Sequence, residues 1–295
     1  MKTYAFETWD VFTKTRFEGN PLAVVPDAAG LSDAQMQTLT REFNLAETVF
    51  ILPPKDPNNT ARLRIFTPSY EMPFAGHPTV GASLSIARAR KLSGLIRLEL
   101  NAGVFPVRID ADRPVPTAQF ENPNLPAERG PAPDAALLEA ALSLPEGSVD
   151  RGAHKPRRIG AGVNFYFFKA PLEAVRGARI NSAAWEELDM KGLVGVLLYA
   201  EGGENAGASY HVRMFAPDAG VPEDPATGGA AASLPGQIAL SQKLADGKHE
   251  WVVEQGYEMG RPSRIEIELE TLGGAVRAVR IGGAAVPVSK GEIAV

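Results

Sequence analysis

Three titratable residues in this chain have the type and the surroundings that proton transfer requires. Glu47 lies in the apolar run Phe43–Phe50, His77 in Phe-Ala-Gly-His-Pro-Thr, and Asp224 in Pro-Glu-Asp-Pro-Ala-Thr-Gly. A carboxyl group takes a proton from carbon efficiently when partial burial moves its pKa toward neutrality. The residues alone leave Glu47 two interpretations: a strand side chain that alternates out to solvent, or a buried acid/base.

The segments around His77 and Asp224 are two copies of one pattern. The matching residues are Phe66 with Phe215, Pro68 with Pro217, Pro73 with Pro222, Pro78 with Pro225 and Gly81 with Gly228. Their offset is about half the chain, which indicates two similar halves and not a solenoid of short repeats. In this alignment His77 and Asp224 each precede a proline that opens a buried helix.

Two helix N-termini at equivalent positions predict a site that binds negative charge. Their N–H groups and dipoles would hold a substrate carboxylate or stabilise an enolate, and Gly76 and Gly228 would let the backbone approach closely. The simpler alternative is that Asp224 is an ordinary N-cap and that His77 has no role. Asn20, in Gly-Asn-Pro, is either a turn residue or a polar contact to substrate, and both interpretations stay open.

The hydrophobic pattern predicts many strands and few long helices. In the first half we expect strands at 3–12, 22–25, 48–52, 61–66, 95–100 and 104–109, and helices at 33–42 and 78–92. In the second half we expect strands at 157–160, 163–168, 194–200, 208–215, 250–254, 263–269 and 275–281, and helices at 134–143 and from Pro225. Small and apolar residues all round 78–92 predict a buried helix.

These elements predict an α+β fold with two pseudo-symmetric domains, each a β-barrel or sheet wrapped around a central helix. The stretch 113–133 is rich in proline and polar residues and is interpreted as the crossing between the halves. The expected domains are 1–115, joined by the C-terminal strand at about 283–295, and 116–282.

Composition excludes several classes of function. Of the 295 residues, 44% are hydrophobic and 22% charged, which is typical of a soluble globular protein with a hydrophobic core. The net charge of −5 argues against nucleic acid or an anionic membrane as partner. There is no cysteine, and the 4 histidines form no His-x-x-x-His pair, so we expect no disulfide, no thiolate chemistry and no metal site. No apolar segment resembles a signal core or a membrane span, so a cytoplasmic location is predicted.

Several segments together resemble the phenazine-biosynthesis isomerase family. They are 10–13, 19–25, 44–50, 66–79, 222–228 and 255–262, and they follow the family's order over nearly the whole chain. The resemblance implies the diaminopimelate epimerase fold, an interdomain cleft, a homodimer and no cofactor. The implied reaction is a proton shift in a small carboxylated metabolite; in the family's type reaction this is a dihydro-hydroxyanthranilate.

Carried over residue by residue, the resemblance implies that Glu47 is the acid/base and that His77 and Asp224 line the same cleft. It assigns substrate binding to the positions of Asn20, Gly76, Gly228 and Gly229. The family usually has serine after Thr-Gly, and this chain has Gly229 instead. The absence of cysteine excludes the two-thiol racemisation of the epimerase relatives. The alternative function is a small-molecule-binding or regulatory protein that kept the scaffold without the chemistry; Gly229 favours it, and the retained acid/base residues oppose it.

Overall fold

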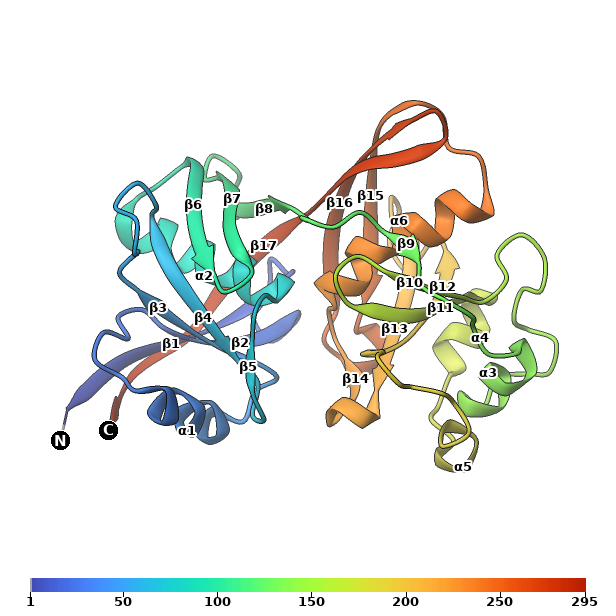
Figure 1. Ribbon diagram of the computed structural model, residues 1–295, viewed down its shortest axis with the longest axis horizontal. Helices are drawn as coiled ribbons and strands as arrows, with labels where there is room; N and C mark the ends of the chain where they lie inside the picture. Colours follow the sequence, from blue (N-terminus) through green and yellow to red (C-terminus); the bar gives the residue numbers. More distant parts are fainter. Residues whose placement is uncertain (1) are drawn as a thin grey trace. The chain divides into compact units, whose positions relative to one another are not determined.

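The computed structural model describes residues 2–295, which divide into two compact units. Unit 1 comprises the chain up to Glu121 together with Gly282–Val295, and unit 2 is Asn122–Ile281. The last strand, β17 (Ala275–Ala294), therefore begins in unit 2 and ends in unit 1. In unit 1 it runs beside the first strand, β1 (Thr3–Val11), as the red and blue ribbons of Figure 1 show.

Unit 1 is a barrel around helix α2 (Gly76–Arg90). Within residues 2–295, strand pairing closes a ring of 8 strands in the order β1, β2, β3, β4, β6, β7, β8 and β17. The remaining bounds are β2 (Asn20–Val25), β3 (Thr48–Leu52), β4 (Ala61–Phe66), β5 (Glu71–Met72), β6 (Gly94–Leu100), β7 (Gly103–Asp110), β8 (Thr117–Glu121) and the outer helix α1 (Asp33–Phe43).

Helix α2 is the centre of this barrel because its side chains are small or apolar on every face. Every residue from Gly76 to Ala87 is buried. The helix packs against strands β1, β2, β3, β4, β7 and β8. At Gly81 a Cβ atom would stand 2.5 Å from Leu22 Cδ2, so only glycine lets β2 approach this closely. The predicted buried helix is confirmed.

Helix α1 sets where the next strand begins. Ser32 and Gln35 form a capping box at its N-terminus, and Asn44 ends it in the left-handed conformation with φ 51°. The chain then turns through residues 45–47 into β3. Glu47 thus lies at the junction of a well-defined helix end and a buried strand, where its backbone is fixed from both sides.

Unit 2 is built in the same way around helix α6 (Gly228–Ser241). Its strands are β9 (Ala127–Glu128), β10 (Arg157–Gly160), β11 (Asn164–Lys169), β12 (Gly195–Glu201), β13 (Tyr210–Ala216), β14 (Val221–Asp224), β15 (Gly247–Gln255) and β16 (Ser263–Leu272). Short helices are α3 (Ala135–Ala141), α4 (Leu172–Gly177), α5 (Ser182–Trp185) and the 3₁₀ turns η1 (Pro217–Ala219) and η2 (Tyr257–Met259). Helix α6 packs against β9, β10, β11 and β16, and α3 to α5 contribute to a second apolar cluster around Phe168.

The two units share one order of strand pairing. In unit 1, the antiparallel pairs are β1 with β2, β3 with β4, β4 with β5 and β6 with β7. The parallel pairs are β2 with β3 and β4 with β6. Strands β10, β11, β12, β13, β14, β15 and β16 repeat this order in unit 2. The expected α+β architecture with two pseudo-symmetric epimerase-like halves is confirmed.

The sheet register defines which residues of the two units are equivalent. Ile65 pairs with Met72 on β5, and Met214 pairs with Asp224 on β14. The neighbouring ion pairs agree, since Arg64 Nε donates to Glu71 at 2.7 Å and Arg213 Nε donates to Glu223 at 2.8 Å. Asp224 is therefore the equivalent of Met72.

The predicted match of Pro78 with Pro225 is wrong. Helix α6 begins at Gly228, after the extended N-cap Thr227, whereas α2 begins at Gly76, before its proline. The 3₁₀ turn η1 lengthens the stretch between β13 and β14, so the offset between the halves grows here and does not shrink. Counting from the helix starts, His77 is the equivalent of Gly229.

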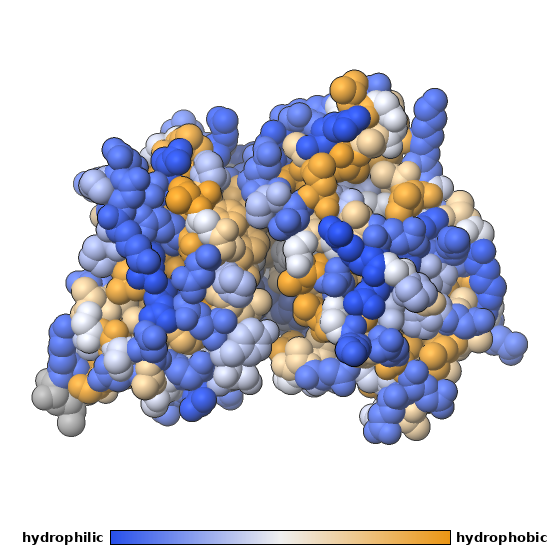
Figure 2. Space-filling model, in the orientation of Figure 1, coloured by the Kyte–Doolittle hydropathy of each residue, from blue (hydrophilic) through white to orange (hydrophobic). Residues whose placement is uncertain are grey.

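The visible face of the molecule in Figure 2 is mostly hydrophilic, with scattered hydrophobic residues. Among the exposed apolar side chains are Leu95 and Val104, on strands β6 and β7. None of the helices in residues 2–295 has the length and hydropathy needed to cross a bilayer.

Candidate active site

Two of the predicted catalytic residues, Glu47 and His77, are neighbours in unit 1. His77 Nε2 lies 3.4 Å from Glu47 Oε2, and the side chains are 5% and 17% exposed. Glu47 therefore does not point out to solvent, and the solvent-facing interpretation is wrong. His77 comes from the first turn of α2 and Glu47 from the segment before β3, so the junction after α1 and the buried helix bring them together.

The ring of His77 is held neutral by its surroundings. Burial lowers its pKa to about 3, and a hydrogen bond to the backbone of Pro21 acts in the opposite direction but is outweighed. Proline has no N–H, so His77 must donate this bond to the Pro21 carbonyl. Because Nε2 faces Glu47, we infer that Nδ1 carries the proton and that Nε2 presents a lone pair to the carboxyl group.

Asp224 lies in unit 2 within a compact set of hydrogen bonds. Thr227 Oγ1 donates to Asp224 Oδ2 at 2.6 Å. Gln255 Nε2 donates to the Asp224 carbonyl at 2.6 Å and to Thr227 Oγ1 at 3.0 Å, while Gln255 Oε1 accepts from Thr227 N at 3.0 Å. The N-cap of α6 is Thr227, so Asp224 is not the N-cap that its place before Pro225 suggested.

The predicted glycines stand at the same place in the two buried helices. Gly76 is the first residue of α2 and Gly228 the first of α6, and both are buried. The N-cap residues, Ala75 and Thr227, make no side-chain hydrogen bond to the helix, whereas Ser32 caps α1. The first N–H groups of α2 and α6 are thus left to partners other than an N-cap side chain, which suits a bound anion.

Asn20 and Gly229 occupy contrasting surroundings. Asn20, the first residue of β2, is only 1% exposed, so it is a buried residue and not an exposed turn residue. At Gly229, a Cβ atom would stand 3.3 Å from Val163 Cγ2 and 3.8 Å from the ring of Phe165. The surroundings of Gly229 are therefore apolar.

The polar residues of unit 1 have small or apolar equivalents in unit 2. For Glu47, His77 and Asn20, taken in that order, the register gives Gly195, Gly229 and Val163. The converse holds for the hydrogen-bonded set of unit 2. For Asp224, Thr227 and Gln255, the equivalents in unit 1 are Met72, Ala75 and Leu100. Each unit carries polar groups that the other lacks, as expected of a duplicated scaffold whose halves have diverged.

The structure thus joins Glu47 with His77 in unit 1 and Asp224 with Gln255 in unit 2. That all three predicted catalytic residues meet in one site stays a prediction. Sequence reasoning missed Thr227 and Gln255. Gln255 ends a strand within the motif Gln-Gly-Tyr-Glu-Met-Gly-Arg-Pro, and an amide at such a strand end was the available signal.

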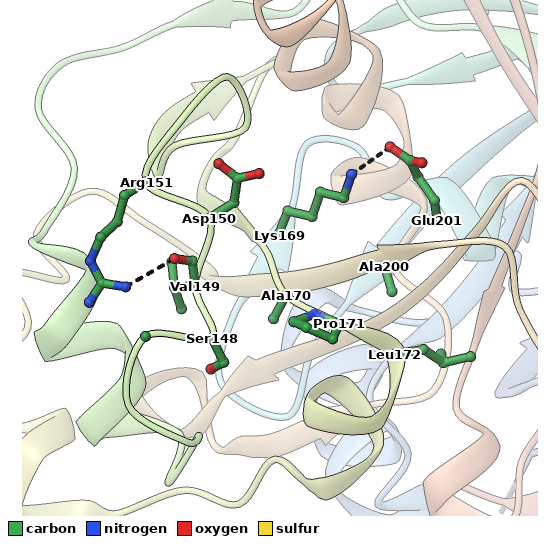
Figure 3. Close-up of a pocket in the computed structure, with 11 residues that line it drawn as sticks. Ser148, Val149, Asp150, Arg151, Lys169, Ala170, Pro171, Leu172, Ala200 and Glu201 are labelled. Atoms are coloured by element: carbon green, nitrogen blue, oxygen red, sulfur yellow. Dashed lines mark hydrogen bonds and ion pairs between the residues drawn. The ribbon is translucent and has the colours of Figure 1, made fainter.

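Unit 2 also has a groove away from these residues, with a volume of about 540 Å³ (Figure 3). Both of its basic side chains are in ion pairs: Lys169 Nζ lies 2.6 Å from Glu201, and Arg151 is paired with Glu139. Asp150 accepts a hydrogen bond from Gly152 N. The groove therefore offers no unpaired cation for an anionic ligand. No cluster of three or more metal-ligating side chains occurs in the part of the chain that the structure describes.

The family model described as phenazine biosynthesis-like protein matches residues 9–291. The chain belongs to this family. A relative from Mesorhizobium japonicum, named an uncharacterized isomerase, is 41% identical over 300 residues, covering 99% of each chain. The trans-2,3-dihydro-3-hydroxyanthranilate isomerase of Pseudomonas aeruginosa is 32% identical over 296 residues and covers 96% of each chain. The crystal structure of the Bacillus anthracis phenazine biosynthesis protein has the same fold, with a TM-score of 0.90 over 100% of both chains at 24% identity.

These likenesses confirm the resemblance to the family and the expectation of an isomerase. The non-catalytic alternative is not favoured.

Proposed function

We propose that this isomerase moves a proton between two carbon atoms of a small carboxylated metabolite without a cofactor, and that Glu47 is the acid/base. The observation that carries the proposal is the contact between Glu47 Oε2 and His77 Nε2 at 3.4 Å in a largely buried setting. General acid/base chemistry on carbon needs a positioned carboxyl group, and an adjacent hydrogen-bond acceptor can hold its protonated form in place.

Glu47 alone can both remove the proton and return it, so the reaction balances without a second acid or base. The Glu47 carboxylate takes a proton from one carbon, the C–H electron pair moves into the conjugated system, and the protonated Glu47 then delivers that proton to another carbon. Reactant and product are isomers, so the reaction needs neither an oxidant nor a reductant. A neutral His77 whose Nε2 lone pair faces Glu47 would accept a hydrogen bond from the protonated carboxyl group and hold it between the two transfers.

The substrate carboxylate is assigned to the helix N-termini. Gly76 and Gly228 have no side chain and would let a ligand approach the backbone, and the positive ends of α2 and α6 favour an anion by about 0.3–1 kcal/mol each, more where water is excluded. Asp224 and Asn20 would orient the polar groups of the substrate. Gly229 would leave one contact apolar where a serine would donate a hydrogen bond. A homodimer remains part of the proposal and is tested by sedimentation.

The experiment is solvent exchange. The protein is incubated in D₂O with trans-2,3-dihydro-3-hydroxyanthranilate, on which the Pseudomonas aeruginosa relative is named to act, and with a panel of unsaturated carboxylates. Deuterium should enter the carbon that receives the proton in at least one of them, as read by NMR and mass spectrometry. Saturable binding of these compounds with no exchange in any of them would favour the non-catalytic alternative.

A further inference from the structure

Gln255 is a buried amide whose hydrogen bonds all go to one turn. The side chain is 0% exposed and ends strand β15. Its partners are Asp224 and Thr227, on the turn that leads from β14 to α6. Gly256, in the left-handed conformation with φ 79°, adds a close approach, since a Cβ atom there would stand 2.7 Å from the Pro225 carbonyl oxygen. Two consecutive residues thus brace the turn that carries Asp224.

The orientation of the amide follows from the backbone groups it meets. The Thr227 N–H can only donate, so the atom facing it is Oε1; the Asp224 carbonyl can only accept, so the atom facing it is Nε2. The second hydrogen on Nε2 is directed to Thr227 Oγ1. This hydroxyl is therefore an acceptor from Gln255, and its own hydrogen is left for Asp224 Oδ2, 2.6 Å away.

This chain of bonds fixes the role of one carboxylate oxygen. Because the Thr227 hydroxyl hydrogen points to it, Asp224 Oδ2 is held as a hydrogen-bond acceptor. The bond is short, as expected when the acceptor is charged. These hydrogen bonds also restrict rotation of the Asp224 side chain before a substrate binds, as a preorganised site requires.

The other unit shows that the fold itself does not need this arrangement. The equivalent of Gln255 is Leu100, that of Thr227 is Ala75 and that of Asp224 is Met72. Unit 1 thus builds the same turn between strand and helix with three apolar residues. Thr227 and Gln255 are thus polar only in the unit that also has the Asp224 carboxylate. A role in orienting that carboxylate requires this.

We propose that Gln255 is a positioning residue that, through Thr227, holds the Asp224 carboxylate as a fixed hydrogen-bond acceptor for the substrate. This rests on the proposed function, because it takes Asp224 as a substrate-contacting residue. Gln255 itself touches the Asp224 backbone and Thr227, so it acts through them.

The test compares two buried glutamines of unit 2. Gln237 is also 0% exposed and lies about 13 Å along α6 from the helix start. Its amide donates to the Lys155 carbonyl and to Tyr199 and accepts from Arg157, so it makes no bond to the turn that carries Asp224. Gln255→Met and Gln237→Met remove the same group from equally buried places. We expect Gln255→Met to lower kcat about 10–100-fold with KM within about threefold, and Gln237→Met to change kcat less than about twofold. If kcat falls by a similar factor in both variants, in proportion to the fall in Tm, the role of Gln255 is purely structural and the proposal is contradicted.

Two further variants separate positioning from folding. Thr227→Val removes the hydroxyl at constant shape and should lower kcat as Gln255→Met does, whereas Thr227→Ser keeps the hydroxyl and should retain it. In the Asp224→Asn background, Gln255→Met should have little further effect on kcat, because the two changes act on one group. Independent, multiplying effects would contradict the proposal.

A separate readout keeps this test distinct from the proposed function. If the wild type neither turns over nor exchanges any compound, the proposed isomerisation fails. The bracing is then judged by hydrogen exchange of the Thr227 amide, which donates to Gln255 Oε1. Faster exchange in Gln255→Met and not in Gln237→Met supports the bracing, and unchanged exchange in both contradicts it.

Discussion

Glu99 in unit 1 and Glu254 in unit 2 are equivalent residues that brace equivalent loops. The register gives the match, since Glu99 lies opposite Arg62 and Glu254 opposite His211 in the parallel pairs of each unit. Glu99 accepts hydrogen bonds from Lys55 N, Asp56 N and Asn59 Nδ2, at 2.8, 2.8 and 2.9 Å. Glu254 accepts from Glu204 N, Asn205 N and Asn205 Nδ2, at 2.7, 3.2 and 2.7 Å. The duplication therefore preserved a loop anchor that has no part in the proposed chemistry.

The hydrogen bonds of Glu99 should make the folding stability of unit 1 depend on pH in the acidic range. The Asn59 amide, with the N–H groups of Asp56 and Lys55, lowers the pKa of Glu99 to about 2 from 4.5. A carboxyl with a lowered folded pKa stabilises the fold above its unfolded pKa, and this contribution is lost as pH falls from about 4.5 to about 2. Glu99→Gln should lower Tm at pH 7, and the difference from wild type should shrink as the pH falls toward 2. Thermal melts between pH 2 and pH 7 test this, with exposed Glu42→Gln as the control; a difference that stays constant with pH would contradict it.

The fold was largely predictable from local patterns, and particular residues show why. The run of small and apolar residues that includes Gly81 predicts a helix buried on all sides, and the alternation of Leu63 and Ile65 with arginines predicts β4. Both signals act over a few residues, where periodicity is reliable. Glu47 and His77 stood out for a different reason, because a titratable group within an apolar segment is uncommon.

The parts that were missed depend on contacts between distant residues or on loop length. Gln255 lies 31 residues from Asp224 and 28 from Thr227, and no periodicity connects them. The alignment of the halves failed at Pro225 because proline recurs often in this stretch and the inserted turn η1 changes the spacing. Glu99 and Glu254 carried no local signal either, since their partners lie on loops about 40 to 50 residues away.

His77 should remain neutral well below the usual range for histidine. Burial lowers its pKa to about 3, so its ¹⁵N and ¹³C ring resonances should stay those of a neutral ring from pH 8 down to about pH 4, with the proton on Nδ1. Between pH 6.5 and pH 3 the unfolded chain binds this proton and the folded chain does not, so His77 makes the folded state less stable as the pH falls. A titration midpoint near 6.5, or a ring protonated on Nε2, would contradict the proposed arrangement with Glu47.

Glu47→Gln should abolish proton transfer while leaving the fold intact. The amide keeps the shape of the side chain but cannot carry the proton, and loss of general acid/base catalysis costs about 10²–10⁴-fold in rate. Turnover and solvent deuterium incorporation should fall together, while the affinity for substrate stays within a few-fold of wild type. Glu42→Gln, an exposed change in α1, is the matched control and should be fully active. Equal exchange by wild type and Glu47→Gln would exclude Glu47 as the base and direct attention to His77 or Asp224.

Gly229→Ser should be tolerated by the fold and should change which substrate is used. The added Cβ would stand 3.3 Å from Val163 Cγ2, but Val163 is 39% exposed and can move by a few tenths of an ångström, so we expect a change in stability of about 0.5 kcal/mol or less. The control is Gly195→Ala, where the new Cβ would stand 2.5 Å from the Phe215 carbonyl oxygen and 2.8 Å from Met214 Sδ. Backbone cannot yield as a surface valine does, so Gly195→Ala should lower the free energy of unfolding by about 1–3 kcal/mol.

The measurements are denaturant melts of both variants and kcat/KM of Gly229→Ser over the substrate panel. Because the serine adds a hydrogen-bond donor at an apolar wall, the variant should gain on substrates with a polar group there and lose on those without one. A uniform change over the whole panel would show that position 229 does not contact substrate.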